Sequence, residues 1–139
     1  MDVELTTGVK TYRRSEDGYF IINGRQSNFK ISEFACKDKE NTDELLVDGE
    51  LIEKLQIMRE HFRAPIYINS GFRTEKHNAE VGGVAGSYHT KGKAADIVVS
   101  GVPSGTVANF ARIIGFRGVG TYSTFTHVDT REAISYWNG

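Results

Sequence analysis

The sequence contains little cysteine, little proline and no long apolar run, and each shortage excludes a class of protein. The single cysteine, Cys36, excludes an internal disulfide and a cysteine-rich zinc knuckle. No apolar stretch approaches the ~20 residues that a membrane-spanning helix needs. Only two prolines stand against fifteen glycines, which indicates many turns and few rigid breaks.

An excess of one charge is also missing. The chain has 17 Lys and Arg against 18 Asp and Glu, which leaves a net charge of −1. Proteins that bind nucleic acid normally show a basic excess or stripe, so we expect no nucleic-acid partner. The 139 residues, of which 39% are hydrophobic, suffice for one folded domain and are too apolar for a disordered chain.

The pattern of apolar residues predicts an α+β fold. Residues 49–63 place Leu51, Leu55, Met58 and Phe62 on one helical stripe that ends before Pro65. Strands are expected at 66–70, 94–99, about 119–123 and 125–130, and further helices at 74–81 and after Pro103. This order predicts a small, mostly antiparallel sheet with helices packed on one side.

The N-terminal part is less regular. Residues 1–27 are expected to form a β-ribbon or arm with short strands near 8–12 and 19–22, and residues 28–139 to form the main domain. Asn23-Gly24 closes the second of these strands with a strong turn sequence.

Two histidines and two aspartates form a candidate site. Asp96 interrupts an apolar strand, and a buried carboxylate is costly unless it is paired, hydrogen-bonded or bound to a metal. His89 lies seven residues earlier, while His127 and Asp129 alternate on the closing strand and therefore share one face. Two imidazoles and a carboxylate with a fourth position open to water form a catalytic zinc set. An ion-paired aspartate beside two unrelated histidines fits the spacing equally well.

The remaining histidines, His61 and His77, are expected to have structural or surface roles, because one lies in a helical stretch and the other in a polar run.

Several segments resemble a known family. The string SYHTKGKAAD at 87–96 resembles the S-x-H-x-x-G-x-A-x-D motif of the zinc D-alanyl-D-alanine carboxypeptidases, and FTHVD at 125–129 resembles their last-ligand strand. NSGFRT at 69–74 resembles their S-G-[YF]-R segment. NFKISEF at 28–34 is similar to the opening of bacterial and phage murein peptidases. The resemblance implies the fold shared by D-alanyl-D-alanine peptidases and the hedgehog signalling domain.

The resemblance also implies roles for single residues. His89, Asp96 and His127 would bind one zinc ion per chain. Arg73 would bind or polarise a substrate carbonyl or carboxylate, for which its planar guanidinium is suited. Ser87 would contact the substrate or support a ligand.

The sequence departs from the family at one position. The better-known members carry an acidic general base three residues before the last histidine, where this chain has Thr124. Asp129 is the nearest replacement as a general base. Its alternative role is to accept a hydrogen bond from a zinc-bound histidine and orient it.

These features together predict a monomeric zinc metallopeptidase that hydrolyses peptide bonds in peptidoglycan stem peptides. Whether it is a carboxypeptidase or an endopeptidase, such as a phage endolysin, stays open. The first four residues lack the pattern of a signal peptide, so we expect a protein kept in the cytoplasm until release, or a module of a larger wall-acting protein. The alternatives are a zinc-binding wall-binding module without catalysis and a phage structural protein.

Overall fold

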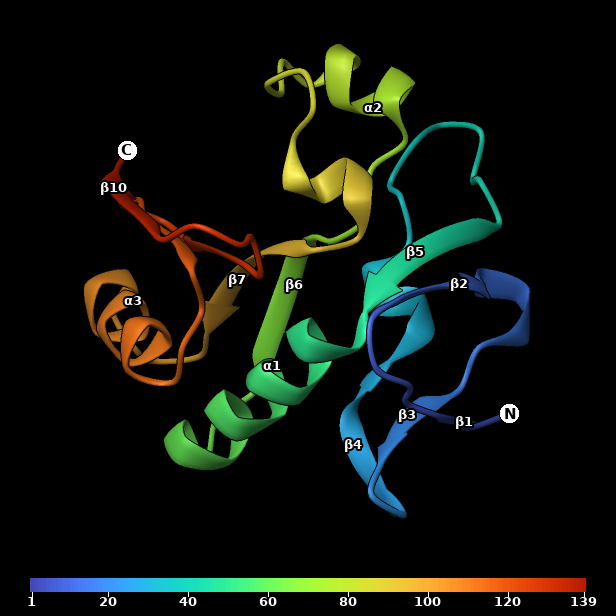
Figure 1. The fold of residues 1–139 in the computed structure, drawn as a ribbon, viewed down its shortest axis with the longest axis horizontal. Coiled ribbons are helices and arrows are strands. Elements are labelled where there is room, and N and C mark those ends of the chain that lie inside the picture. Colours follow the sequence, from blue (N-terminus) through green and yellow to red (C-terminus); the bar gives the residue numbers. More distant parts are fainter.

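The computed structural model describes all 139 residues and shows an α+β fold with three helices and three small sheets (Figure 1). The helices are α1 (Gly49–Phe62), α2 (Glu75–Glu80) and α3 (Ser104–Ile113). The strands, in chain order, are β1 (Val3–Glu4), β2 (Val9–Arg13), β3 (Tyr19–Ile22), β4 (Arg25–Lys30), β5 (Glu44–Asp48), β6 (Ile66–Ser70), β7 (Ala94–Val99), β8 (Gly118–Thr121), β9 (Thr126–Asp129) and β10 (Ser135–Asn138).

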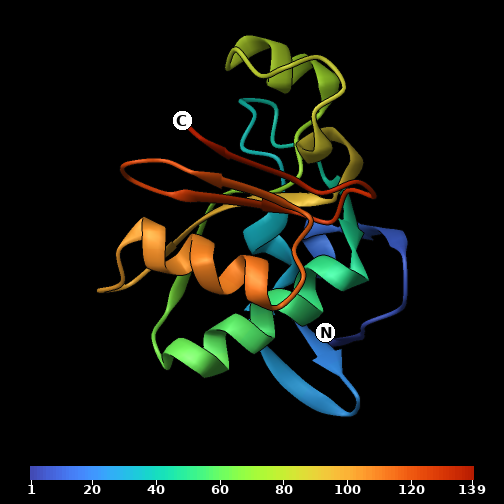
Figure 2. The same cartoon turned by 60° about the vertical axis from the view of Figure 1, so that its left-hand side comes forward.

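The five-stranded sheet is the part of the fold that carries the candidate site. Its strand order is β10-β8-β9-β7-β6, and every neighbouring pair is antiparallel except β10 and β8. One face is apolar and fully buried, with Ala95, Ile97 and Val99 from β7 beside Val119 and Val128. Figure 2 shows α1 and α3 below the strands, and α2 above them. The face opposite α1 and α3 is therefore free to hold polar side chains.

Helix α1 has well-defined ends. The Asp48 side chain accepts a hydrogen bond from the Glu50 backbone N–H, and Arg63 ends the helix in the left-handed conformation. Its buried residues are Gly49, Leu51, Ile52, Leu55 and Met58. A contact between α1 and α3 is made by His61, whose ring stacks on Phe110 with 3.7 Å between centroids.

The N-terminal residues pack into the same core as the rest of the chain. Strand β2 pairs with β5, and β3 lies between β1 and β4. Tyr12 and Phe20 contact each other edge to face at 5.3 Å, and Phe20 contacts Phe34 at 6.0 Å. The domain boundary at residue 27 stays a prediction.

The α+β class and the mostly antiparallel sheets are confirmed. The predicted helices and strands from residue 49 to residue 130 occur within two residues of their expected bounds. The prediction missed β1, β4, β5 and β10, and it also missed the three 3₁₀ helices Arg14–Glu16, Ile31–Phe34 and Tyr88–Lys91, the last of which is labelled η3. No helix has both the length and the apolar character needed to cross a membrane.

Candidate metal centre and substrate groove

One row of residues crosses the polar face of the sheet. The strand register aligns Ser70 of β6 with Asp96 of β7, His127 of β9, Gly120 of β8 and Trp137 of β10. Since residues in register on neighbouring strands point to the same face, this pairing brings the carboxylate, the imidazole and the indole together. The Oδ1 atom of Asp96 lies 2.9 Å from Nδ1 of His127.

The second histidine reaches the sheet from η3. Ser87 caps this short helix, with its Oγ atom accepting a hydrogen bond from the His89 backbone N–H. The Arg73 backbone N–H donates to the His89 carbonyl oxygen, which ties η3 to the segment that follows β6. As a result, the Nε2 atom of His89 lies 3.3 Å from Oδ1 of Asp96, and only 3% of His89 is exposed.

The outer nitrogen of each imidazole faces a hydrogen-bond acceptor. Nδ1 of His89 lies 2.8 Å from the Gly71 carbonyl oxygen, and Nε2 of His127 lies 2.7 Å from Oδ2 of Asp129. A neutral imidazole has one N–H, and in the tautomer that leaves the inner nitrogen free to bind a metal this proton is on the outer nitrogen of each ring. The inner nitrogens then direct lone pairs toward the Asp96 carboxylate.

Three acceptors that converge in this way can hold a cation between them. One ligand atom from each of His89, Asp96 and His127 lies within 4.8 Å of the other two. Two nitrogens and one carboxylate oxygen are ligands that zinc uses in catalytic sites, where a fourth position stays open. The donor set therefore fits a zinc ion.

The contacts within this cluster shift the pKa values of Asp96 and His127. Burial opposes ionisation of Asp96, but its contacts with His127 and His89 outweigh that effect and hold the pKa of Asp96 well below its usual range. Burial lowers the pKa of His127, but its contacts with Asp129 and Asp96 outweigh that effect and raise the pKa. Asp96 is thus a carboxylate at neutral pH and an available ligand.

Asp129 is completely buried behind His127. Its Oδ2 atom accepts from Arg131 at 2.6 Å as well as from His127, and its Oδ1 atom accepts from the Arg131 side chain at 2.8 Å and from its backbone N–H at 3.1 Å. Burial raises the pKa of this carboxyl, but the Arg131 and His127 hydrogen bonds outweigh it and lower the pKa overall. Gly118 makes room for the carboxylate, since a Cβ at this glycine would lie 2.0 Å from Oδ1.

Arg73 is held beside the cluster through three side-chain nitrogens. Its Nε donates to Ser70 Oγ at 3.0 Å, one terminal nitrogen to Asn78 Oδ1 at 3.1 Å, and the other to Asp96 Oδ2 at 3.4 Å. The side chain is 17% exposed. Each terminal nitrogen keeps a second N–H, so the guanidinium can still donate to a substrate oxygen.

A groove of about 710 Å³ runs over the cluster. Its lining includes Arg73, Ser87, His89, Asp96 and His127 among the predicted site residues. Aromatic residues form part of the wall: Tyr122 stacks on Phe125 and accepts a hydrogen bond from Trp137 Nε1 at 2.9 Å. A glycine-containing loop, residues 81–86, lies on the rim.

The other predicted residues lie away from this groove. Asp129 does not line it, so Asp96 is the groove's only lining carboxylate. Thr124 lies in the turn between β8 and β9 and lines a separate cavity beside α3. Glu75, a further carboxylate near Arg73 in the sequence, is at the start of α2 and does not line the groove.

Three residues near the site were missed by sequence reasoning. Asn78 is 97% buried, accepts from Arg73 and donates to the Val84 carbonyl oxygen at 2.9 Å. Arg131 lies between the rings of Tyr88 and Trp137, 4.6 Å and 5.0 Å from their centroids. The Arg131 position two residues after Asp129 was a usable clue, because charged residues that alternate on one strand share a face. No such alternation with a predicted site residue pointed to Asn78 or Trp137.

The fold and the site together define a small α+β domain with a buried His-Asp-His cluster suited to a catalytic metal. The chain belongs to the peptidase M15 family, whose pattern matches residues 27–129, and this family is zinc-dependent.

Two similar proteins are curated as peptidoglycan peptidases. A probable peptidoglycan L,D-endopeptidase MepK from Haemophilus influenzae is 33% identical over 120 residues, which cover 79% of this chain and 64% of that protein. The peptidoglycan L,D-endopeptidase MepK of Escherichia coli K12 is 36% identical over 78 residues, which cover 51% of this chain and 43% of that protein. The chain therefore spans less than two thirds of the length of either relative.

Proposed function

We propose that this protein is a zinc-dependent endopeptidase that hydrolyses an L,D peptide bond in peptidoglycan, with one zinc ion bound by His89, Asp96 and His127. The observation that carries the proposal is the convergence of two imidazole lone pairs on the Asp96 carboxylate at the floor of a groove. The family membership and the L,D-endopeptidase activity of the two relatives support the choice of bond.

A zinc ion held by these three residues would supply a Lewis acid and would lower the pKa of a water molecule toward ~7. The residues of the chain prepare the site for that chemistry. The Gly71 carbonyl and the Asp129 carboxylate fix the tautomers of His89 and His127, so both rings present a lone pair without rearrangement.

Arg73 binds the substrate in this proposal. Its contacts with Ser70, Asn78 and Asp96 fix the guanidinium at the edge of the metal cluster. The two remaining N–H groups can donate to the carbonyl oxygen of the scissile bond, where negative charge develops during attack. Ser87 lines the same groove and contributes its hydroxyl at the substrate surface.

We assign Asp129 the orienting role rather than that of general base. Both of its oxygens are occupied by Arg131 and His127, and its side chain is fully buried. A general base must reach the water from which it takes a proton, directly or through one further water. Because Asp129 is enclosed behind His127, it is placed to accept a hydrogen bond from that histidine and orient it.

The proposal is tested by incubating the protein with purified peptidoglycan and identifying the products by mass spectrometry. An L,D-endopeptidase cuts internal bonds and produces shorter peptides whose combined mass exceeds that of the substrate by one water for each bond cleaved. A carboxypeptidase instead releases single C-terminal amino acids. Activity should disappear with a zinc chelator, return with added zinc, and be absent in His89→Ala.

The same experiment addresses the alternative of a wall-binding module. The absence of a second carboxylate in the groove favours that alternative, because no acidic base lies beside the metal cluster. Stoichiometric zinc, sedimentation with peptidoglycan and no change in the product masses would establish binding without hydrolysis and refute the proposed activity.

A further inference from the structure

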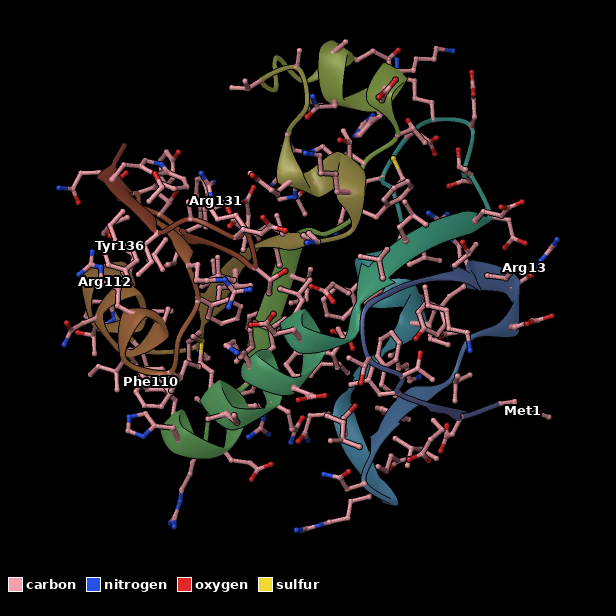
Figure 3. All side chains as sticks on the ribbon, in the orientation of Figure 1. Met1, Arg13, Phe110, Arg112, Arg131 and Tyr136 are labelled. Atoms are coloured by element: carbon pink, nitrogen blue, oxygen red, sulfur yellow. The ribbon has the colours of Figure 1, made fainter.

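A second cavity borders the groove over the metal cluster. This neighbouring cavity has a volume of about 500 Å³ and shares Tyr88, Arg131 and Ser135 with the groove. Figure 3 labels Arg131 between β10 and the η3 turn, and this side chain lines both spaces. A peptide that crosses the metal cluster can therefore extend past the Tyr88–Arg131 pair into the second cavity.

The second cavity is basic. Lys91 and Lys93 line it together with Arg131, and Glu132 is its only acidic lining residue. Neither lysine forms an ion pair with any carboxylate of the chain, Glu132 included. Arg131 is already neutralised by Asp129. The two ammonium groups are thus positive charges without a carboxylate partner in the chain.

The turn that carries both lysines is held firmly in place. Gly92, between them, has a φ of +73°, and a Cβ there would lie 2.4 Å from the Leu46 carbonyl oxygen. Its own carbonyl oxygen accepts from the Asp48 backbone N–H at 2.8 Å. The Lys91 ammonium lies 4.7 Å from the centroid of the Tyr88 ring. The lysines therefore extend from a fixed backbone beside the groove, and not from a free loop.

We propose that Lys91 and Lys93 form a subsite for a carboxylate group of the peptide substrate, next to the metal cluster and beyond the Tyr88–Arg131 pair. The inference rests on the proposed function and deepens it by naming a charge that the substrate must carry. A carboxylate that enters this cavity is attracted by the two lysine ammonium groups. Its amide counterpart is neutral and gains no such attraction. The subsite thus selects acidic peptides over amidated ones.

The test compares two proteins with two peptides. The peptides are a crosslinked dimer released from peptidoglycan and the same dimer with its carboxylates converted to carboxamides. The proteins are the wild type and Lys91→Gln/Lys93→Gln. In the wild type the acid form should have the lower KM. In the double variant this preference should shrink by about 3- to 10-fold, as expected for two partly exposed charge pairs, with kcat unchanged.

Matched controls isolate the local effect. The control variant Lys10→Gln/Lys30→Gln removes two exposed lysines of the N-terminal strands. Their ammonium groups lie 5.8 Å and 5.2 Å from the centroids of tyrosine rings, far from the second cavity in the sequence. This variant should keep the full preference for the acid peptide. Lys91→Arg/Lys93→Arg should retain most of the preference, and 1 M salt should weaken it in the wild type because the Debye length falls to ~3 Å.

An equal effect of amidation in the wild type and in Lys91→Gln/Lys93→Gln would overturn the subsite. Binding separates this failure from failure of the proposed function. Trp137 is the chain's only tryptophan and lines the groove, so its fluorescence reports peptide binding without hydrolysis. A charge preference in binding that depends on the lysines, but without any cleavage, supports the subsite and refutes only the peptidase activity.

Discussion

Replacing Asp129 by asparagine tests how the candidate metal centre is built. The substitution keeps the shape of the side chain and removes its charge. In the protein both carboxylate oxygens accept two hydrogen bonds each, from Arg131 and His127. An asparagine has only one acceptor oxygen, so in either orientation its NH₂ group faces two buried donors.

The magnitude follows from those contacts. A buried donor left without an acceptor costs about 1–3 kcal/mol, and the Arg131 charge also loses its partner. We therefore expect a decrease of about 2 kcal/mol in the free energy of unfolding. Because His127 loses the acceptor that fixes its tautomer, zinc affinity should fall by about 10- to 100-fold.

Zinc affinity is measured by competition with a chromophoric chelator, at a temperature where circular dichroism shows the variant to be folded. Peptidoglycan hydrolysis is then followed against added zinc. If Asp129 orients His127, activity recovers toward the wild-type value as zinc is raised. The control is Asp48→Asn, which alters another buried carboxylate: it accepts from Thr130 Oγ1 at 2.6 Å and contacts no ligand. This control should lose stability and retain zinc affinity.

The orienting role would be refuted if Asp129→Asn kept the wild-type zinc affinity and its kcat were ~10²–10⁴-fold lower and not restored by added zinc. That result would make Asp129 the general base and would require the groove to open toward it. An equal loss of zinc affinity in the Asp48→Asn control would show that both changes act through general destabilisation.

Three further predictions concern separate parts of the molecule. His89→Ala should reduce bound zinc from one per chain to a trace in elemental analysis, because three protein ligands leave none to spare; full zinc content would contradict the ligand assignment. Arg73→Lys should keep the fold and the zinc but lose most of kcat/KM on a peptidoglycan fragment, since lysine cannot reproduce the three-way contacts of the guanidinium. Glu50 has a pKa of about 2, because the Arg117 hydrogen bonds outweigh the opposing effect of burial. Its folded pKa lies below the unfolded value, so Glu50→Gln should lower the stability by about 1 kcal/mol at pH 7, and urea unfolding should show this difference vanish as the pH falls from 5 to 2.

The sequence predicted the cluster of His89, Asp96 and His127 because its clues are local. Asp96 is a charged residue in an apolar strand, and His127 lies on a short closing strand with a clear alternation. The η3 turn was missed, although it lies within the motif and ends at Gly92, whose left-handed conformation turns the chain back toward the sheet. A motif of ten residues therefore contains most of the information that positions two of the three proposed ligands.

The partners of those residues depend on long-range register, which no local pattern encodes. Strand β10 pairs in parallel with β8 after a loop, and only this pairing places Trp137 beside His127, with 5.2 Å between ring centroids. Strand β5 was missed because its five residues lead directly into α1, so that its apolar positions merge with the helical pattern. Asn78 sits in a polar helix, and its burial results from contact with Arg73 and the loop that ends at Val84.

The composition of β8 shows how the sheet accommodates the site. Glycine weakens a strand because it loses more backbone entropy and offers no side chain to pack, yet two of the four residues of β8 are glycines. The register aligns Gly118 with Asp129 and Gly120 with His127, so both glycines lie on the polar face of the sheet. A Cβ at Gly118 would overlap the Asp129 carboxylate, and one at Gly120 would lie 2.5 Å from the Trp137 ring. Between them stands Val119, fully buried on the opposite face. The strand thus packs into the core through Val119 and leaves space for the partners of His127 at Gly118 and Gly120. Alternate positions of this one strand therefore serve the candidate metal centre and the hydrophobic core.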